Sequence, residues 1–174
     1  MLLNGDVDFA ITFPPLSGAD IESRILIQDP IYLVIAGGHP LLRQATIYLR
    51  DLEQYELISL TADNPFASYC DELLSKKNVA LSFRRVGYSK LMAIIDRERN
   101  QGKLLGLSSR KQFASWFGAG YRCLRIEDFN ESLMTAVSWR KESSFAYEYK
   151  GLIKELEEDY DRIYYRNYSI MDPE

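Results

Sequence analysis

Hydroxyl and aromatic side chains follow three segments of this sequence that are typical of buried strands. Thr12 and Phe13 end the first segment, residues 61–64 follow the second, and Tyr88 and Ser89 follow the third. In open α/β sheets, ligands bind beyond the carboxyl ends of the strands, where helices begin and their first backbone N–H groups lack partners. Hydroxyl groups, aromatic walls and amide donors at such an edge indicate a site for an anionic or polar small molecule.

Part of this set also has an ordinary structural role. Asn64 stands directly before Pro65, and Ser89 stands before an amphipathic segment, so both residues are suited to cap a helix without any ligand. Taken singly, such residues are caps more often than ligand contacts. Only their convergence at neighbouring strand ends favours a binding site, and the sequence alone leaves both interpretations open.

Residue patterns that commonly carry catalysis or hold metals are missing from the sequence. His39 is the only histidine and precedes Pro40 in a turn, where we expect a structural role. There is no nucleophile elbow, no phosphate-binding loop and no cluster of metal ligands. Cys70 and Cys123 lie far apart in the sequence and indicate neither a metal site nor a disulfide framework. We therefore expect no enzymatic activity, no metal and no cofactor.

Composition and charge place the chain among globular proteins that do not bind nucleic acid. It has 174 residues, of which 47% are hydrophobic, and a net charge of −4. Residues 148–174 account for this net charge, so the preceding chain is balanced and has no basic stripe to neutralise phosphates. No apolar run approaches the roughly 20 residues of a membrane-spanning helix, and the first residues do not form an export signal. We expect a cytoplasmic protein.

Strand-length apolar runs alternate with segments of helical periodicity, a pattern that predicts an α/β protein with largely parallel strands. The helices are expected to begin near residues 64, 89, 108 and 144, each with apolar residues spaced on one face. The expected strands are residues 8–13, 31–36, 57–60, 82–86, 104–107 and 133–139.

Several segments resemble one family when they are taken in order. LLNGDVDFAIT, residues 2–12, is similar to the L-x-x-G-x-x-D-h-A-h element, with h apolar, of the effector-binding domains of LysR-type transcriptional regulators. ILIQDPIYLVIAGGHPLL, residues 25–42, resembles the following pair of strands and the His-Pro-Leu turn of that family. The later segments SKLMAIIDRERNQGKLLGLSS and TAVSWRK resemble its helix, glycine and strand and its returning strand. The sequence departs from the family at the pocket edge near Leu107, where the family's Gly-x-Gly and proline are not matched.

The resemblance covers roughly residues 2–161 and implies the fold of type 2 periplasmic binding proteins, in which each of two lobes is an open sheet flanked by helices. Lobe one would comprise residues 1–52 and 133–166, lobe two residues 54–130, and a tail residues 167–174. The first lobe would be incomplete, since in that family its first strand and helix, a linker helix and a winged helix-turn-helix precede the matching residues. Crossover segments at residues 37–51 and 130–133 would form the hinge.

The function that the resemblance implies is effector sensing, in which a small anionic metabolite binds between the lobes and shifts their orientation. The protein would form a homodimer through lobe edges and would contact DNA only through the helix-turn-helix, with no membrane contact. Two alternatives are a stand-alone solute-binding module of this fold and an enzyme on this fold. The expected ligand contacts are Thr12, Phe13, Thr61, Ala62, Asn64, Phe66, Tyr88, Ser89 and Leu107.

Overall fold

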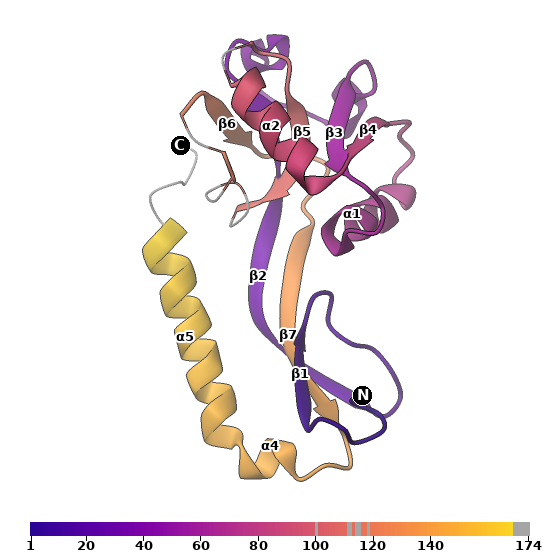
Figure 1. Cartoon of the computed structure of the whole chain (residues 1–174), viewed down its shortest axis with the longest axis vertical. Helices are drawn as coiled ribbons and strands as arrows, with labels where there is room; N and C mark the ends of the chain where they lie inside the picture. Colours follow the sequence, from indigo (N-terminus) through magenta and orange to yellow (C-terminus); the bar gives the residue numbers. More distant parts are fainter. Residues whose placement is uncertain (100, 111–112, 114–115, 118, 169–174) are drawn as a thin grey trace. The chain divides into compact units, whose positions relative to one another are not determined.

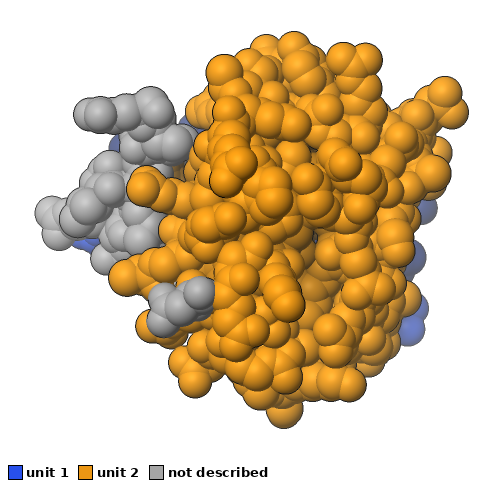
Figure 2. Space-filling view, turned by 90° about the horizontal axis from the view of Figure 1, so that it is seen from above, with its two compact units in different colours: residues 1–29, 132–172 blue, residues 30–131, 173–174 orange. Residues whose placement is uncertain are grey.

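The chain folds into two compact units, each with part of a mixed sheet (Figures 1 and 2). The computed structural model describes residues 1–99, 101–110, 113, 116–117 and 119–168, without the side chains of residues 146, 161 and 163–168. Of the described residues, unit 1 comprises Met1–Asp29 and residues 132–168, and unit 2 comprises Pro30–Glu131. Residues 30–52, which we expected in the first lobe, therefore belong to the second unit.

Unit 1 is built on three strands and two helices. β1 (Phe9–Thr12) pairs antiparallel with β7 (Ser132–Arg140), and β7 lies between β1 and β2 (Ile21–Ala36) in the strand order. Its helices are α4 (Phe145–Glu148) and α5 (Lys150–Tyr168). The buried core of the unit consists of Leu26, Val137, Trp139, Phe145 and Ile153.

The C-terminal helix differs from the one predicted from residue 144. The chain forms two helices there, because Tyr149 leaves the helical conformation between α4 and α5. The expected tail, residues 167–174, overlaps the end of α5 at residues 167–168, and residues 169–174 lie outside the described part of the chain.

Strand β2 is longer than the sequence predicts. The expected strand over residues 31–36 is its second half, and the expected pair of strands within residues 25–42 is one continuous strand of 16 residues. Its burial accounts for the difference: residues 31–36 are all buried, whereas buried and exposed positions are mixed along residues 21–29. The buried apolar run at residues 31–36 is enough to predict a strand, but the mixed pattern of residues 21–29 is not. Pro30, which has no N–H to donate, stands where the chain passes from one unit to the other.

Unit 2 contains the parallel part of the sheet and the α1 and α2 helices (Figure 1). β2, β5, β3 and β4 lie in that order, and β6 also pairs with β2. β3 is parallel to both β4 and β5, whereas β2 is antiparallel to β5 and β6. The bounds of its elements are β3 Glu56–Leu60, α1 Pro65–Ser75, β4 Ser82–Val86, α2 Tyr88–Glu98, β5 Leu105–Ser109 and β6 Tyr121–Leu124, with short 3₁₀ helices η1 at Pro40–Arg43 and η2 at Leu49–Leu52.

These elements confirm the predicted α/β class and most of its strands. The prediction of largely parallel strands is wrong, because among the described residues β1–β7, β2–β5 and β2–β6 pair antiparallel and only β3 pairs parallel, with β4 and β5. The expected strands at residues 57–60, 82–86 and 104–107 are β3, β4 and β5, whereas β6 was not predicted. The helix expected from residue 108 falls partly on residues 111, 112, 114, 115 and 118, which lie outside the described residues. In the described part of the chain, no helix combines the length and the apolar character that crossing a membrane requires.

Gly106 allows β5 to lie close against β3. A Cβ atom at this position would stand 2.8 Å from the carbonyl oxygen of Ile58, its partner in the ladder. Real Cβ atoms do not approach a backbone oxygen so closely, so a larger residue would push the two strands apart. Gly106 therefore serves the packing of β5 against β3.

His39 is a capping residue of the first 3₁₀ helix. Its Nδ1 accepts a hydrogen bond from the Leu41 backbone N–H at 3.2 Å, and its ring packs 4.8 Å from the ring of Tyr55. Burial lowers the pKa of His39 below its ordinary value of 6.5. The fold therefore favours the neutral imidazole, which is also the form able to accept the capping bond.

Replacing His39 by asparagine tests this role, because the asparagine side chain offers a capping oxygen and does not titrate. Since the pKa of His39 is lower in the folded state, its contribution to the free energy of unfolding is fully present above pH 6.5. It is lost as the pH falls from 6.5 toward the folded-state pKa. Urea unfolding at pH 7.5, 6.5 and 5.5 should show a steeper loss of stability for the wild type than for His39→Asn. Equal slopes would contradict the assignment.

Cys70 should be an unreactive thiol. Its side chain lies on the buried face of α1, and burial, reinforced by the Asp71 carboxylate and opposed by Arg85, raises its pKa to about 12. In a Cys123→Ser variant at pH 8, a disulfide reagent should modify Cys70 at least about a hundredfold more slowly than free cysteine, because the thiolate is the reactive species. Urea should abolish this protection. Rapid reaction of the folded variant would show that Cys70 is accessible.

Candidate functional site

The carboxyl ends of β3, β4 and β5 meet at one edge of unit 2, which we call the carboxyl edge. Leu60 and Val86 are ladder partners, and the Thr61 N–H donates to the Val86 carbonyl at 3.2 Å. Ile58 is the partner of Gly106, so Leu107 follows at the same edge. The edge thus gathers seven of the predicted ligand contacts: Thr61, Ala62, Asn64, Phe66, Tyr88, Ser89 and Leu107.

Thr12 and Phe13, the other two predicted contacts, belong to unit 1. Thr12 is the last residue of β1 and lies opposite Ala136 of β7. Its Oγ1 atom is buried and has no hydrogen-bond partner among the described residues. A buried hydroxyl without a partner is uncommon in native proteins and calls for a specific cause, such as a bound water or ligand.

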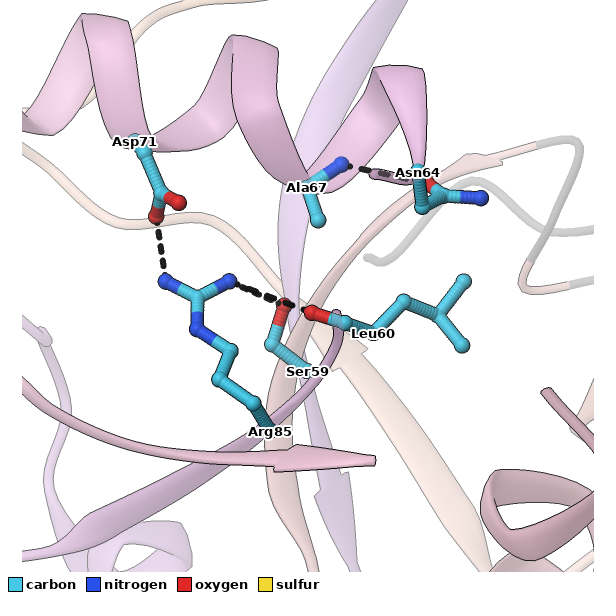
Figure 3. A network of polar contacts seen from close by, with 6 residues as sticks. All are labelled: Ser59, Leu60, Asn64, Ala67, Asp71 and Arg85. Carbon is cyan, nitrogen blue, oxygen red and sulfur yellow. Dashed lines mark hydrogen bonds and ion pairs between the residues drawn. The ribbon is translucent and has the colours of Figure 1, made fainter. Parts of the chain in front are cut away.

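The first turn of α1 satisfies its own donors. Asn64 Oδ1 accepts hydrogen bonds from the N–H groups of Phe66 at 3.0 Å and Ala67 at 3.2 Å, and Pro65 has no N–H. The Asn64 amide nitrogen points away from the helix (Figure 3). The capping interpretation of Asn64 is therefore correct. The expectation that α1 presents free amides to a ligand is wrong, because the cap accepts both of them.

The first turn of α2 is different. The helix begins at Tyr88, and its N-cap is Gly87, which has no side chain to offer. Ser89 lies within the first turn, so the capping interpretation of Ser89 is wrong. The backbone N–H groups of Tyr88, Ser89 and Lys90 have no partner among the described residues, whereas the Leu91 N–H bonds the Gly87 carbonyl at 3.0 Å. This turn therefore combines free donors with the positive end of the helix dipole.

Aromatic side chains border the carboxyl edge, as the sequence indicated. Tyr88 is 55% exposed, and its ring meets the Trp116 ring edge-on at 5.6 Å. A small cavity of about 30 Å³ is lined by Phe66, Leu107 and Trp116, among other residues. This volume is about that of one water molecule, so the cavity alone is too small for a metabolite.

Ser108 and Trp116 also line this small cavity, although sequence reasoning did not count them as contacts. Trp116 is spaced with Phe113 and Phe117 like a core stripe on the helix expected from residue 108. Such a stripe does not distinguish a residue beside a cavity from one inside the core. The sequence offers no signal that would have separated the two.

Arg85 ties α1 to the end of β3 (Figure 3). One guanidinium nitrogen lies 2.5 Å from Asp71 Oδ1 on α1, and the other donates to Ser59 Oγ at 2.9 Å and to the Leu60 carbonyl at 3.3 Å. The guanidinium also lies 4.4 Å from the centre of the Phe83 ring. These contacts hold the helix against the sheet and so fix the position of the α1 start at the carboxyl edge.

Sequence reasoning did not identify the role of Arg85. Arg84 and Arg85 stand side by side in the sequence. Only strand alternation, together with the place of α1, shows which of them can reach Asp71.

Among the described residues, no group of three or more histidine, cysteine, aspartate or glutamate side chains is arranged to hold an ion. The edge is instead suited to hydrogen bonding of a small polar molecule.

A family model described as the LysR substrate binding domain matches residues 1–96. The chain is also 36% identical over 56 residues to the transcriptional dual regulator GltC of Bacillus subtilis (strain 168), a match that covers 32% of this chain and 19% of GltC.

Solved structures with a similar fold cover nearly the whole chain. A Corynebacterium glutamicum OxyR C206 mutant matches 98% of this chain and 52% of its own, with a TM-score of 0.73 and 16% identity. The Synechocystis PCC6803 CcmR regulatory domain in complex with 2-PG matches 91% of this chain and 76% of its own, with a TM-score of 0.69 and 16% identity. The effector binding domain of QuiR in complex with shikimate matches 91% of this chain and 72% of its own, with a TM-score of 0.61 and 18% identity.

These likenesses confirm the predicted fold class, that of the effector-binding domains of LysR-type regulators. The chain spans about half the length of the OxyR chain and about a fifth of GltC. Because the family model matches more than half of its residues, the chain belongs to the LysR substrate binding domain family.

Proposed function

We propose that this chain is the effector-sensing part of a LysR-type transcriptional regulator and binds a small anionic metabolite. The observation that carries the proposal is the start of α2, where three neighbouring backbone N–H groups lack partners among the described residues. They lie at the carboxyl edge of the parallel part of the sheet, and open α/β sheets bind ligands at such an edge. The family match supplies the regulatory context.

The groups around this turn suit a carboxylate or phosphate. Backbone N–H groups at a helix start form an anion site, and the exposed hydroxyls of Thr61 and Ser89 add donors. The exposed Lys90 ammonium adds positive charge to the same turn. Tyr88 provides an apolar wall beside it. Two structural relatives are solved with small molecules, CcmR with 2-PG and QuiR with shikimate, which makes small acids the first compounds to test.

Thr12 stays a predicted ligand contact, since its buried hydroxyl has no partner among the described residues. Phe13, the next residue, stays a prediction that rests on its place directly after the first strand. Asn64 keeps only its amide nitrogen for a ligand, because its oxygen caps α1. We therefore place the principal anion contacts at the α2 turn rather than at the α1 turn.

DNA contact in such a regulator would come from a winged helix-turn-helix other than these two units. The balanced charge of residues 1–147 supports this division, because tight binding to DNA needs basic side chains. We further propose a cytoplasmic homodimer. β1 lies at the end of the strand order, and Ile11 on it is 40% exposed, so its edge is available to a second copy.

Two other functions are less well supported. A stand-alone solute-binding module would use the same edge and the same fold, but the matching family consists of transcriptional regulators. An enzyme on this fold would turn over the compound that it binds. We propose binding without catalysis.

Ligand binding at the α2 turn can be tested with a panel of small carboxylates and phosphates that includes shikimate and 2-PG. A compound present at about 100 times its dissociation constant should stabilise the fold by about 2.7 kcal/mol and raise the unfolding temperature by several degrees. Ser89→Leu places a bulky apolar group among the free N–H groups and should remove this thermal shift.

Ser68→Leu is the matched control, because Ser68 is also exposed and lies near the start of α1. This variant should retain the full shift. A Ser89→Leu variant that keeps the shift while Ser68→Leu loses it would move the anion site to α1. No shift with any compound, or turnover of one, would refute the proposed function.

A further inference from the structure

Unit 2 has a larger cavity at the opposite end of its strands. Its volume is about 280 Å³, and its lining includes Glu56, Arg84, Glu98 and Lys103. Glu56 is the first residue of β3, whereas the carboxyl edge begins after Leu60, the last. Glu56 and Leu60 are four steps apart along the strand, a distance of about 13 Å. The cavity is therefore distinct from the carboxyl edge.

Strand alternation explains which side chains reach this cavity. Glu56 and Ile58 are two positions apart on β3 and share a face, and Arg84 is the ladder partner of Ile58. Arg85, the next residue, points to the other face and binds α1 through Asp71. The cavity accordingly lies on the α2 side of the sheet, where Ile58 and Leu104 contribute apolar walls.

Glu98 is the most enclosed charged group of this lining. Its side chain is only 13% exposed, and its Oε1 accepts hydrogen bonds from Arg97. Its Oε2 is buried and has no donor among the described residues. Glu98 also ends α2, where the helix dipole is negative. This end of the cavity therefore favours a cationic hydrogen-bond donor.

The rim of the cavity has the opposite preference. Arg84 and Lys103 are exposed, and neither forms an ion pair with any residue that the structure describes. The exposed Glu56 adds one carboxylate to the lining, so the two cations leave the rim with a net positive charge that favours a carboxylate. The cavity volume of about 280 Å³ is slightly below the range that drug-sized ligands occupy. A cavity of this volume suits a metabolite of amino-acid size.

We propose that this cavity is a second small-molecule site, which takes a free amino acid with its ammonium toward Glu98 and its carboxylate toward Arg84 and Lys103. The apolar walls formed by Ile58 and Leu104 would contact an aliphatic side chain. This site is separate from the anion site at the α2 turn, since none of residues 88–90 lines the cavity, although Ile58 and Leu104 also line the small cavity at the carboxyl edge. A regulator with both sites would respond to two metabolites.

Amide NMR spectra of the full chain during titration with amino acids test the proposal. Glycine, L-alanine, L-serine, L-valine and L-leucine are added separately up to about 20 mM, a concentration that reveals even millimolar affinity. At least one should shift the amide signals of residues 55–58, 94–98 and 103–105. The matching acid without an ammonium and the matching amine without a carboxylate should each bind at least about tenfold more weakly.

Substitutions at the charged groups show whether they hold the amino acid. Glu98→Gln and the double variant Arg84→Gln/Lys103→Gln should each raise the dissociation constant of the amino acid about tenfold or more. Arg43→Gln, which changes an exposed arginine outside the lining, should leave it unchanged. Ser89→Leu should also leave it unchanged, although that variant abolishes binding at the α2 turn.

Three results would overturn the proposal. These are no shift with any of the five amino acids, shifts confined to residues 61–64 and 88–90, and equal binding of the acid that lacks an ammonium. The last result would identify a plain anion site at Arg84 and Lys103. Failure here would leave the α2 turn unaffected, because the thermal-shift result depends on Ser89.

Discussion

The Arg85 guanidinium is the contact on which the geometry of the carboxyl edge depends. It joins three elements at once, since it binds Asp71 of α1, the Ser59 hydroxyl of β3 and the last carbonyl of β3 from its own strand β4. Hydrogen bonds to charged groups contribute roughly 1.5–3 kcal/mol each when buried. The Arg85 and Asp71 side chains are 28% and 37% exposed, which places this pair toward the lower end of that range.

The two helices that start at this edge show how one residue decides what a helix N-terminus is able to bind. At α1, Asn64 and Pro65 leave no first-turn donor free. At α2, Gly87 provides no cap, and three N–H groups stay unpartnered among the described residues. The asymmetry gives unit 2 one helix that is held by its own cap and one that is suited to hold an anion.

Much of the fold was predictable because local patterns determine it. Strands with buried positions such as β3 and β5 were recognised because they contain short apolar runs, and Asn64-Pro65 marks a helix start through side-chain geometry alone. The first half of β2 was missed because its mixture of buried and exposed positions does not form a clear pattern. The family resemblance then identified the order of the elements, which periodicity alone does not supply.

The candidate site was only partly predictable, since its chemistry depends on contacts between distant residues. The choice of Thr61, Tyr88 and Ser89 followed from strand ends. Whether a backbone N–H is free depends on the residue at which the helix starts. With Ser89 as N-cap, its hydroxyl would accept from a first-turn N–H, whereas Gly87 as N-cap has no side chain to do so. The different tasks of Arg84 and Arg85 follow from which face of β4 each occupies, and that becomes visible only when α1 and α2 have been placed on the two sides.

Hydrogen exchange of the α1 amides, residues 66–75, measures the central interaction most directly. Arg85→Met removes the guanidinium that binds Asp71, and Arg84→Met makes the same change on the other face of the strand. Arg85→Met should speed exchange in α1 about tenfold, whereas Arg84→Met should leave α1 at the wild-type rate. Unchanged exchange in Arg85→Met, or equal acceleration in both variants, would contradict the account.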